Sequence, residues 1–361
     1  MHKDAACFDA ASEVVSVQNP TDIETGFARI KALQAEGKWI AGFMSYELGY
    51  ALEEKLAHRM PENRAVPLMM FGAYDAPHPA HLSPVSDVAI SDVEYGWDEP
   101  AYTQAFDMLH GFIQAGDVYQ GNLTFPITGR ADTRPEHLFQ ALSQRQAVPY
   151  GALIENTGGP AIVSRSPELF FKTNAAGKIE THPMKGTMPR GMTFDEDTAN
   201  KAFLTSDEKN LAENVMIVDL LRNDLSRVCV AGSVRVPKLF DVQSFETVHQ
   251  MVSVVEGQLT EKADFEAIIR ALFPCGSITG APKLRAMEIL NDLEPAPRDI
   301  YCGAIGWMAP DGASCFNVAI RTLLMDENHV RFNVGGGVVY DSTAPSEYEE
   351  ALWKARFALG T

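Results

Sequence analysis

Strand-like segments are spread along the whole chain, and they do not alternate with helical segments in a regular βαβ rhythm. The stretches with alternating or β-branched apolar patterning are residues 39–46, 66–74, 118–128, 161–164, 168–173, 301–308, 314–325 and 329–334. Helical periodicity occurs at residues 23–35, 98–116, 206–222, 264–273, 282–293 and 345–359. This mixture predicts an α+β fold, in which large, mainly antiparallel β-sheets form a sandwich with helices packed outside them.

Residues 76–84 are the best candidate for a linker, because their three prolines suit neither a helix nor a central strand. The helical signals sharpen after this segment. Asp98 is expected to cap a helix with Pro100 in its first turn and Gly116 near its end. We therefore divide the chain into residues 1–97 and residues 98–361.

The charge balance constrains the kind of partner. With 48 Asp and Glu against 30 Lys and Arg, the formal net charge is −18, which disfavours nucleic acid or an anionic membrane as a partner. No apolar run has the roughly 18–20 residues of a membrane span, and the N-terminus lacks the pattern of a secretory signal. The five cysteines are scattered and form no C-x-x-C pair, which favours a reducing compartment. We expect a cytoplasmic enzyme, and an anionic substrate would need local cations, a metal ion or backbone N–H groups.

The closing helix carries Glu347, Glu350 and Lys354 at spacings that place all three on one face. This face is either solvated, with a Glu350–Lys354 pair, or a site for a hard cation such as Mg²⁺, which prefers oxygen ligands. Glu213 lies in an otherwise apolar helical stretch and is either exposed or usefully paired. Two helices that each offer glutamate would strengthen the metal interpretation, but only the fold can bring them together.

Two further features could serve an anion. The run Gly335-Gly336-Gly337 follows a strand, so it is either a tight turn or a nest of backbone N–H groups for a carboxylate or phosphate. Arg321 lies in the alternating segment 316–324 and projects away from the face of its apolar neighbours. It is either a bidentate partner for a carboxylate or an edge-strand charge.

Lys185 lies in the segment 182–191, whose prolines and glycines predict a shaped loop. His182 and Arg190 are its neighbours in sequence. Partial desolvation beside these groups would favour a nucleophilic amine, whereas a solvated loop lysine is the ordinary alternative.

Six motifs occur in order after residue 98. They are Gly-Asp-Val-Tyr-Gln-Gly-Asn-Leu at 116–123, Ser-Pro-Glu-Leu at 166–169, Pro-Met-Lys-Gly-Thr at 183–187, Ala-Glu-Asn-Val-Met-Ile-Val-Asp-Leu-Leu-Arg-Asn-Asp at 212–224, Gly-Ser-Ile-Thr-Gly-Ala-Pro-Lys at 276–283, and Gly-Gly-Gly-Val-Val at 335–339. With them the chain resembles the chorismate-utilising enzymes, and within that family most closely component I of the aminodeoxychorismate synthases. Residues 1–97 resemble the N-terminal part of the synthase fold more loosely, through Ser-Tyr-Glu-Leu-Gly-Tyr at 45–50, and residues 98–361 resemble the chorismate-binding catalytic region.

The resemblance implies the reaction of chorismate with ammonia to give 4-amino-4-deoxychorismate, on the route to 4-aminobenzoate and folate. It implies that Lys185 attacks C2 as water leaves C4, and that Glu168 is the general acid for this departure. Ammonia would then add at C4 and expel the lysine. His249 matches a histidine that lines the site. The ammonia would come from a separate glutamine amidotransferase, since no cysteine of this chain lies in a Gly-x-Cys-x-Gly elbow.

The resemblance also implies a ligand set. Mg²⁺ would bridge the ring carboxylate to Glu213 and Glu350, with Glu347 close by or acting through water. Tyr301 and Arg321 match groups on the enolpyruvyl carboxylate. The implied substrate-binding residues are Gly186, Thr187, Thr279, Tyr301, Arg321, Gly335, Gly336, Gly337 and Lys354.

Two positions discriminate between relatives, and one departs from the pattern. Anthranilate synthases and isochorismate-forming enzymes usually carry alanine in place of Lys185, and enzymes that add water usually carry lysine in place of Gln120. Asn210 stands where several relatives have an acid, which predicts a more water-filled metal shell. The alternatives are component I of an anthranilate synthase and a non-catalytic subunit that binds an amidotransferase.

Overall fold

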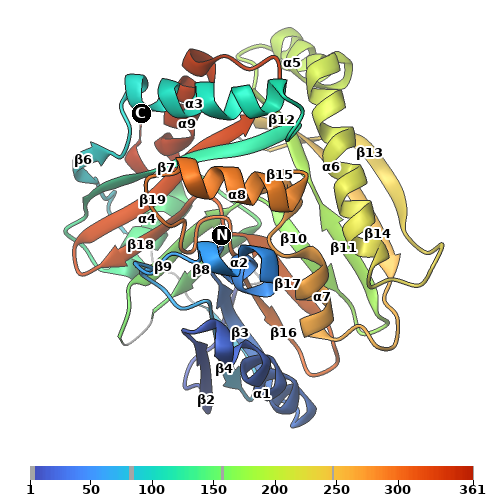
Figure 1. The fold of residues 1–361 in the computed structure, drawn as a ribbon. Helices are drawn as coiled ribbons and strands as arrows, with labels where there is room; N and C mark the ends of the chain where they lie inside the picture. The colour runs from blue at the N-terminus through green and yellow to red at the C-terminus, as the bar shows by residue number, and fades with distance from the viewer. Residues whose placement is uncertain (1–4, 81–84, 156–157, 246–247, 361) are drawn as a thin grey trace.

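The structure, a computed structural model, describes residues 5–80, 85–155, 158–245 and 248–360. Over these residues, two antiparallel sheets of ten and seven strands form the body of the protein, and helices pack outside them (Figure 1). A short pair, β1 (Ala6–Cys7) with β5 (His78–Pro79), stands apart. The expected α+β fold is confirmed. No helix in these ranges is both long and apolar enough to cross a membrane.

The ten-stranded sheet joins the N-terminal part of the chain to the rest. In spatial order its strands are β12 (Met184–Pro189), β14 (Val248–Gln258), β11 (Lys178–His182), β10 (Leu169–Thr173), β17 (Ser314–Val318), β16 (Ala304–Met308), β3 (Trp39–Met44), β4 (Met69–Tyr74) and β2 (Glu13–Val17), while β13 (Arg235–Ser244) also pairs with β14. Because β3 pairs directly with β16, residues 1–97 share a sheet with the C-terminal half. The functional division at residue 97 stays a prediction, and residues 81–84 of the expected linker lie outside the described residues.

The seven-stranded sheet contains the glycine run. In spatial order its strands are β15 (Gly280–Ala281), β7 (Gln120–Arg130), β19 (His329–Val338), β18 (Thr322–Asp326), β9 (Ala161–Ser166) and β8 (Tyr150–Ile154), and β6 (Ser91–Tyr95) pairs with β7. The pairing of β7 with β19 runs without a break from His329 opposite Arg130 to Val338 opposite Gly121. The glycines are therefore part of a central strand, and neither a turn nor a loop after the strand.

The helices cover the outer faces of the two sheets. They are α1 (Ile23–Ala35), α2 (Leu48–Leu52), α3 (Glu99–Gln114), α4 (Pro135–Arg145), α5 (Phe194–Ser206), α6 (Glu208–Ser226), α7 (Phe265–Leu272), α8 (Lys283–Leu293) and α9 (Ala344–Leu359), with 3₁₀ turns at Pro20–Asp22, Glu54–Arg59 and Gly276–Ile278. Asp98 caps α3 as expected, because its carboxylate accepts a hydrogen bond from the N–H of Ala101. The predicted stripe of α3, from Tyr102 to Ile113, is buried.

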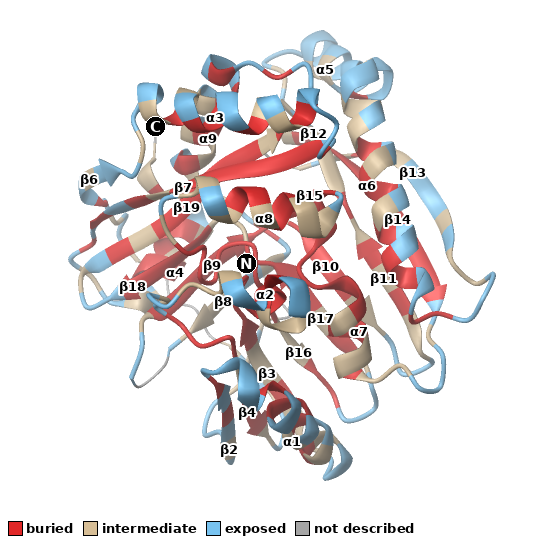
Figure 2. Ribbon diagram, viewed as in Figure 1, coloured by how far each residue is buried: buried red, intermediate tan, exposed pale blue. Residues whose placement is uncertain are grey.

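The two largest hydrophobic cores of the described residues follow from this arrangement (Figure 2). One lies between the ten-stranded sheet and α1, α6 and α7, and the other lies between the seven-stranded sheet and α3, α4, α8 and α9. Figure 2 shows buried residues along the central strands and on the inner faces of these helices, while the outer faces of the helices and strand β13 are largely exposed or intermediate. Helix α9 packs on β19, so its position is fixed directly over the glycine run.

One helix boundary differs from the expectation. Ser206 does not open the long helix; it ends α5, and Asp207 caps α6 by accepting a hydrogen bond from the N–H of Asn210. Helix α5 itself was not expected, because among its residues only Leu204 is buried and no apolar stripe marks it.

The chain crosses between the two sheets at two adjacent places. Strand β9 leads into β10 through Pro167 and Glu168, and β17 leads into β18 through residues 319–321. The crossings are hydrogen-bonded to each other, from the N–H of Arg165 to the carbonyl of Arg321 and from the N–H of Val318 to the carbonyl of Glu168. The prediction of one strand over residues 314–325 was therefore wrong. Arg321 adopts a φ of 51° at the point where the strand breaks.

Candidate active site

Two neighbouring glycines of β19 receive functional groups from opposite sides of the strand. A Cβ atom at Gly336 would lie 3.0 Å from Glu347 Oε2 and 3.5 Å from both Glu350 Oε1 and Lys354 Nζ. A Cβ atom at Gly337 would collide with Gln120 Nε2 and lie 3.5 Å from Lys185 Nζ. Successive strand positions face opposite sides of a sheet. Gly336 therefore leaves room below the face of α9, and Gly337 leaves room beside Gln120 and Lys185.

Glu168 lies at the first crossing between the sheets and is 5 % exposed. Burial raises its pKa to about 7, although a hydrogen bond from Ser277 Oγ to Oε1 (2.7 Å) and the positive charges of Lys185 and Lys354 act in the opposite direction. Because both lysines act on it, Glu168 belongs to the same constellation as the glycines. A carboxyl group with this pKa can hold a proton near neutral pH and deliver it.

Lys185 is not on a loop, as the sequence led us to expect, but on strand β12. The register of β12 against β14 shifts between Met184 and Thr187, and Gly186 in this bulge has a φ of 79°. A bulge of this kind turns a side chain out of the regular pleat. The side chain of Gln250 holds the bulge by donating to the Gly186 carbonyl and accepting from Thr187 Oγ1. His182 and Arg190, the neighbours of Lys185 in sequence, lie within ion-pair distance of Glu180 and Asp197, respectively.

The predicted polar face of α9 points at β19. Glu347 accepts a hydrogen bond from Ser342 Oγ (2.6 Å), and its pKa is raised by burial and by the charge of Glu350. Burial acts on Glu350 too, but the adjacent Lys354 outweighs it and lowers the pKa of Glu350. Lys354 Nζ lies 2.7 Å from Glu350 and donates to the Gly335 carbonyl (2.9 Å). Glu347 is thus buried against β19, whereas Glu350 stays exposed and forms the expected pair with Lys354, so the face is turned inward at one end and solvated at the other.

The carboxylates of α9 fit a hard cation, but the expected set of three is not assembled. Two carboxylates above a glycine that lacks a side chain supply oxygen ligands with room for water. Glu213, half-buried on α6, is not gathered with them: within the described ranges, no three His, Cys, Asp or Glu side chains are close enough together to hold a metal ion. Lys209, one turn before Glu213, nevertheless acts electrostatically on both Glu347 and Glu350.

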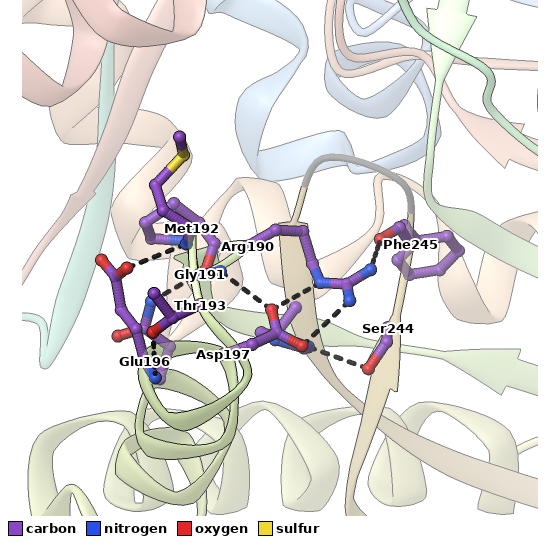
Figure 3. A network of polar contacts seen from close by, with 11 residues as sticks. Arg190, Gly191, Met192, Thr193, Glu196, Asp197, Ser244 and Phe245 are labelled. Carbon is purple, nitrogen blue, oxygen red and sulfur yellow. Dashed lines mark hydrogen bonds and ion pairs between the residues drawn. The ribbon is translucent and has the colours of Figure 1, made fainter.

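His249 lies in a polar network around Asp197, of which Figure 3 labels Asp197, Arg190 and Ser244. Its Nδ1 is 2.8 Å from Ser244 Oγ, and its Nε2 is 2.9 Å from Asp197 Oδ1. Asp197 also accepts two hydrogen bonds from Arg190 and one from the N–H of Gly191, which hold its pKa well below the ordinary value. Both ring nitrogens are therefore occupied by neighbours, and the expected role of His249 in the site stays a prediction.

Three of the remaining predicted substrate-binding residues lie at the ends of strands of the two sheets. Thr279 is fully buried, and its carbonyl accepts from the N–H of Asn122 on β7. Tyr301 is buried just before β16. Arg321 stands at the second crossing, where its guanidinium donates to Gln146 Oε1 (3.0 Å) and burial lowers its pKa.

The model of the family described as chorismate binding enzyme matches residues 78–360. The chain belongs to the chorismate-binding enzyme family. Its structure resembles that of anthranilate synthase component I from Streptococcus pneumoniae TIGR4, with a TM-score of 0.82 at 24 % identity over 98 % of this chain and 91 % of the other. At this level of identity the likeness concerns the fold, and it confirms the expected component I-like architecture.

Two curated relatives of this chorismate-binding enzyme are closer in sequence. The aminodeoxychorismate synthase component 1 of Escherichia coli K12 is 36 % identical over 88 % of this chain and 75 % of its own length. The aminodeoxychorismate synthase of Streptomyces pristinaespiralis is 41 % identical over 80 % of this chain. The match covers 40 % of that relative's length, so this chain corresponds to less than half of that longer relative.

Some residues of the chorismate-binding enzyme acquire a role only from the structure. Ser277 was part of a motif, but nothing in the sequence pairs it with Glu168, which is 109 positions away. Gln250 and Gln146 carried no signal, because an isolated glutamine is ordinary on a surface. Gln120 could be singled out only by comparison with relatives. It is fully buried, and neither atom of its side-chain amide has a hydrogen-bond partner among the described residues.

Proposed function

We propose that this chorismate-binding enzyme is the synthase component of an aminodeoxychorismate synthase. It converts chorismate and ammonia to 4-amino-4-deoxychorismate, on the route to 4-aminobenzoate and folate. The observation that carries the proposal is the position of Lys185: its Nζ lies beside Gly337 and the unpartnered amide of Gln120, and its charge acts on Glu168. The names of the curated relatives from E. coli and Streptomyces support the same activity.

The proposed reaction proceeds in two displacements. The Lys185 amine forms a bond to C2 of chorismate, the ring double bonds shift, and the C4–O bond breaks as Glu168 gives its proton to the departing oxygen. Ammonia then forms a bond to C4, the double bonds shift back, and the C2–N bond to Lys185 breaks. Glu168 suits the first step because its burial keeps it protonated up to about neutral pH.

Mg²⁺ is the proposed cofactor. Glu347 and Glu350 are the residues that would hold it, and Glu213 would join them only through water or a movement of α6. When bound, the cation would neutralise the ring carboxylate and support the departure of the leaving group electrostatically. Both carboxylates lie close to Gly336, where a hard cation would find oxygen ligands.

Chorismate is a dianion, and the protein carries a net charge of −18. The site offers local positive charge to offset this repulsion: Arg321 for the enolpyruvyl carboxylate, and Lys354 beside the glycine strand. Thr279, Tyr301, Gly186 and Thr187 complete the proposed binding surface.

The proposed partner is a separate glutamine amidotransferase that supplies ammonia, in the cytoplasm. Residues 98–361 would carry the chorismate chemistry, and residues 1–97 would complete the ten-stranded sheet. Component I of an anthranilate synthase is the second candidate, since the similar S. pneumoniae structure carries that name. Lys185 favours the first candidate, because an amine placed to attack C2 competes with amination at that carbon.

A product assay tests the proposal. The purified protein is incubated with chorismate, Mg²⁺ and ammonium at mildly alkaline pH, and the products are separated and identified by mass. We expect a non-aromatic amine that yields 4-aminobenzoate when a lyase is added. Anthranilate as the product would support the second candidate, and no turnover even with an amidotransferase would indicate a non-catalytic subunit.

A variant of Lys185 tests the mechanism. Lys185→Ala should lower amination by about 10³-fold or more, because it removes the nucleophile, while chorismate still binds in the presence of Mg²⁺. The matched control is Lys201→Ala, an exposed lysine of α5. Unchanged turnover in Lys185→Ala would rule out the covalent route.

A further inference from the structure

A second arginine, Arg165 on β9, is buried beside the end of α4 and has no anionic partner among the described residues. Its residue is 3 % exposed, and burial lowers the pKa of its guanidinium to about 10. One nitrogen donates to the Gln146 carbonyl (2.7 Å), and the group lies 5.2 Å from the centre of the Phe139 ring. Its Nε has no hydrogen-bond partner among the described residues.

Arg321, which is partly buried, shares this lack of a counter-ion. Across the part of the chain that the structure describes, no carboxylate lies within ion-pair distance of either Arg165 or Arg321. Other buried cations of this protein do have one: Arg298 pairs with Glu294, and Lys283 pairs with Asp224. A buried charge without a partner is costly, so its retention calls for an anion that arrives later.

The strand next to β9 leaves room for the Arg165 guanidinium. Gly151 on β8 lies opposite Arg165, and a Cβ atom there would be 2.7 Å from a guanidinium nitrogen. The φ angle of Gly151 is not in the left-handed region, so the backbone itself does not require glycine. The small residue is explained by the space that the guanidinium occupies.

Gln146 joins the two arginines. It follows the last turn of α4; its carbonyl accepts from Arg165, and its side-chain oxygen accepts from Arg321 (3.0 Å). A second link runs through the backbone, from the N–H of Arg165 to the carbonyl of Arg321 (2.9 Å). The backbone at position 165 is therefore bonded to that of Arg321, and the Arg165 side chain contacts the residue that accepts from the Arg321 guanidinium.

We propose that Arg165 is a positioning residue for the substrate carboxylate that Arg321 binds. It acts through Gln146, and the entering carboxylate offsets one of the two uncompensated guanidinium charges. The inference rests on the proposed function, because the anion is the enolpyruvyl carboxylate of chorismate. Arg165 has no direct contact with the substrate in this scheme.

The competing explanation is local. A cation near the last carbonyls of a helix stabilises the helix. If Arg165 only caps α4, its removal lowers the stability of the protein and leaves the affinity for chorismate unchanged. If it positions Arg321, its removal raises KM for chorismate, with a much smaller effect on kcat.

The test is steady-state kinetics with chorismate and ammonium, together with calorimetric binding of chorismate in the presence of Mg²⁺. Arg165→Met should raise KM and Kd about tenfold and change kcat less than twofold, as expected from one lost charge-assisted hydrogen bond. Arg165→Lys should recover part of this loss. Arg134→Met, which removes an exposed arginine before α4, is the control for the change in net charge and should leave KM unchanged. A KM within twofold of wild type in folded Arg165→Met would overturn the inference.

Two further variants keep the test decisive if Arg165→Met does not fold. Gly151→Ala should displace the guanidinium without removing its charge, and it should raise KM. Gln146→Ala should raise KM as well, and combining it with Arg165→Met should add little, because both changes break the same link. Fully additive effects in the double variant, or no effect of Gly151→Ala and Gln146→Ala, would contradict the inference. A wild type that neither binds nor converts chorismate would instead refute the proposed function.

Discussion

Replacing Ser277 by alanine should shift the alkaline limit of activity upward. Ser277 Oγ donates to Glu168 Oε1 at 2.7 Å, and both residues are buried, so this bond stabilises the charged carboxylate. A hydrogen bond to a charged group contributes about 1.5–3 kcal/mol, and about 1.4 kcal/mol corresponds to one pKa unit. Without the bond, the pKa of Glu168 should therefore rise by about one to two units above its value of about 7.

The direction follows from the role of Glu168 as an acid. Its protonated form is the active one, so activity is present below its pKa and is lost as the pH rises through it. The upward shift should extend the activity of Ser277→Ala to more alkaline pH, even if the maximal rate falls.

The assay is kcat/KM for chorismate from about pH 6 to about pH 9, at a constant concentration of free ammonia so that the nucleophile does not vary. Ser226→Ala, an exposed serine at the end of α6, is the control and should leave the profile unchanged. An alkaline limit that stays in place or moves to lower pH in Ser277→Ala would refute the assignment of Glu168 as the acid.

Three other changes give measurable outcomes. Glu168→Gln should abolish activity yet stabilise the protein above neutral pH. The pKa of Glu168 rises from 4.5 to about 7 on folding, so this group contributes stability at low pH that is lost as the pH rises through about 7. In urea unfolding, the wild type should lose up to about 3 kcal/mol at pH 8 compared with pH 5, and the variant should not. Gly337→Ala should lower kcat by about 10²-fold, because the new methyl group displaces Gln120. Gly336→Ala should have a milder effect, because the nearest atom to its new methyl group, Glu347 Oε2, is 3.0 Å away. Equal effects of the two variants would contradict this geometry. Glu350→Gln should weaken the binding of Mg²⁺, with an apparent Kd for the metal at least tenfold higher. An unchanged metal titration would show that Glu350 is not a ligand.

The parts of the site that lie on one element could be predicted from the sequence. The spacing of Glu347, Glu350 and Lys354 placed them on one face of a helix, and the structure confirms this arrangement. What the spacing could not give was the direction of that face. Only the packing of α9 on β19 buries Glu347 and brings the face over the glycine run, and this packing depends on residues far away in the sequence.

The errors also have tertiary causes. The segment 314–325 has the pattern of one strand, but its two halves pair with different sheets and the chain breaks at Arg321. The glycine run suggested a turn because glycine is rare in strands, whereas here the missing side chains make space for groups from other elements. Helix α5 gave no signal, since it buries little apolar surface.

The pairing of β7 with β19 has a consequence for synthesis of the protein. Gly121 and Val338 are partners, so the first strand leaves the ribosome long before the second exists. Until residues 329–359 are made, β7 lacks its partner on that side, and Gln120 faces no glycine. The nascent chain therefore carries Lys185 and Glu168 without the carboxylates of α9. Premature termination anywhere before this helix would leave an inert polypeptide with an open strand edge, a hazard for aggregation rather than a source of uncontrolled chemistry.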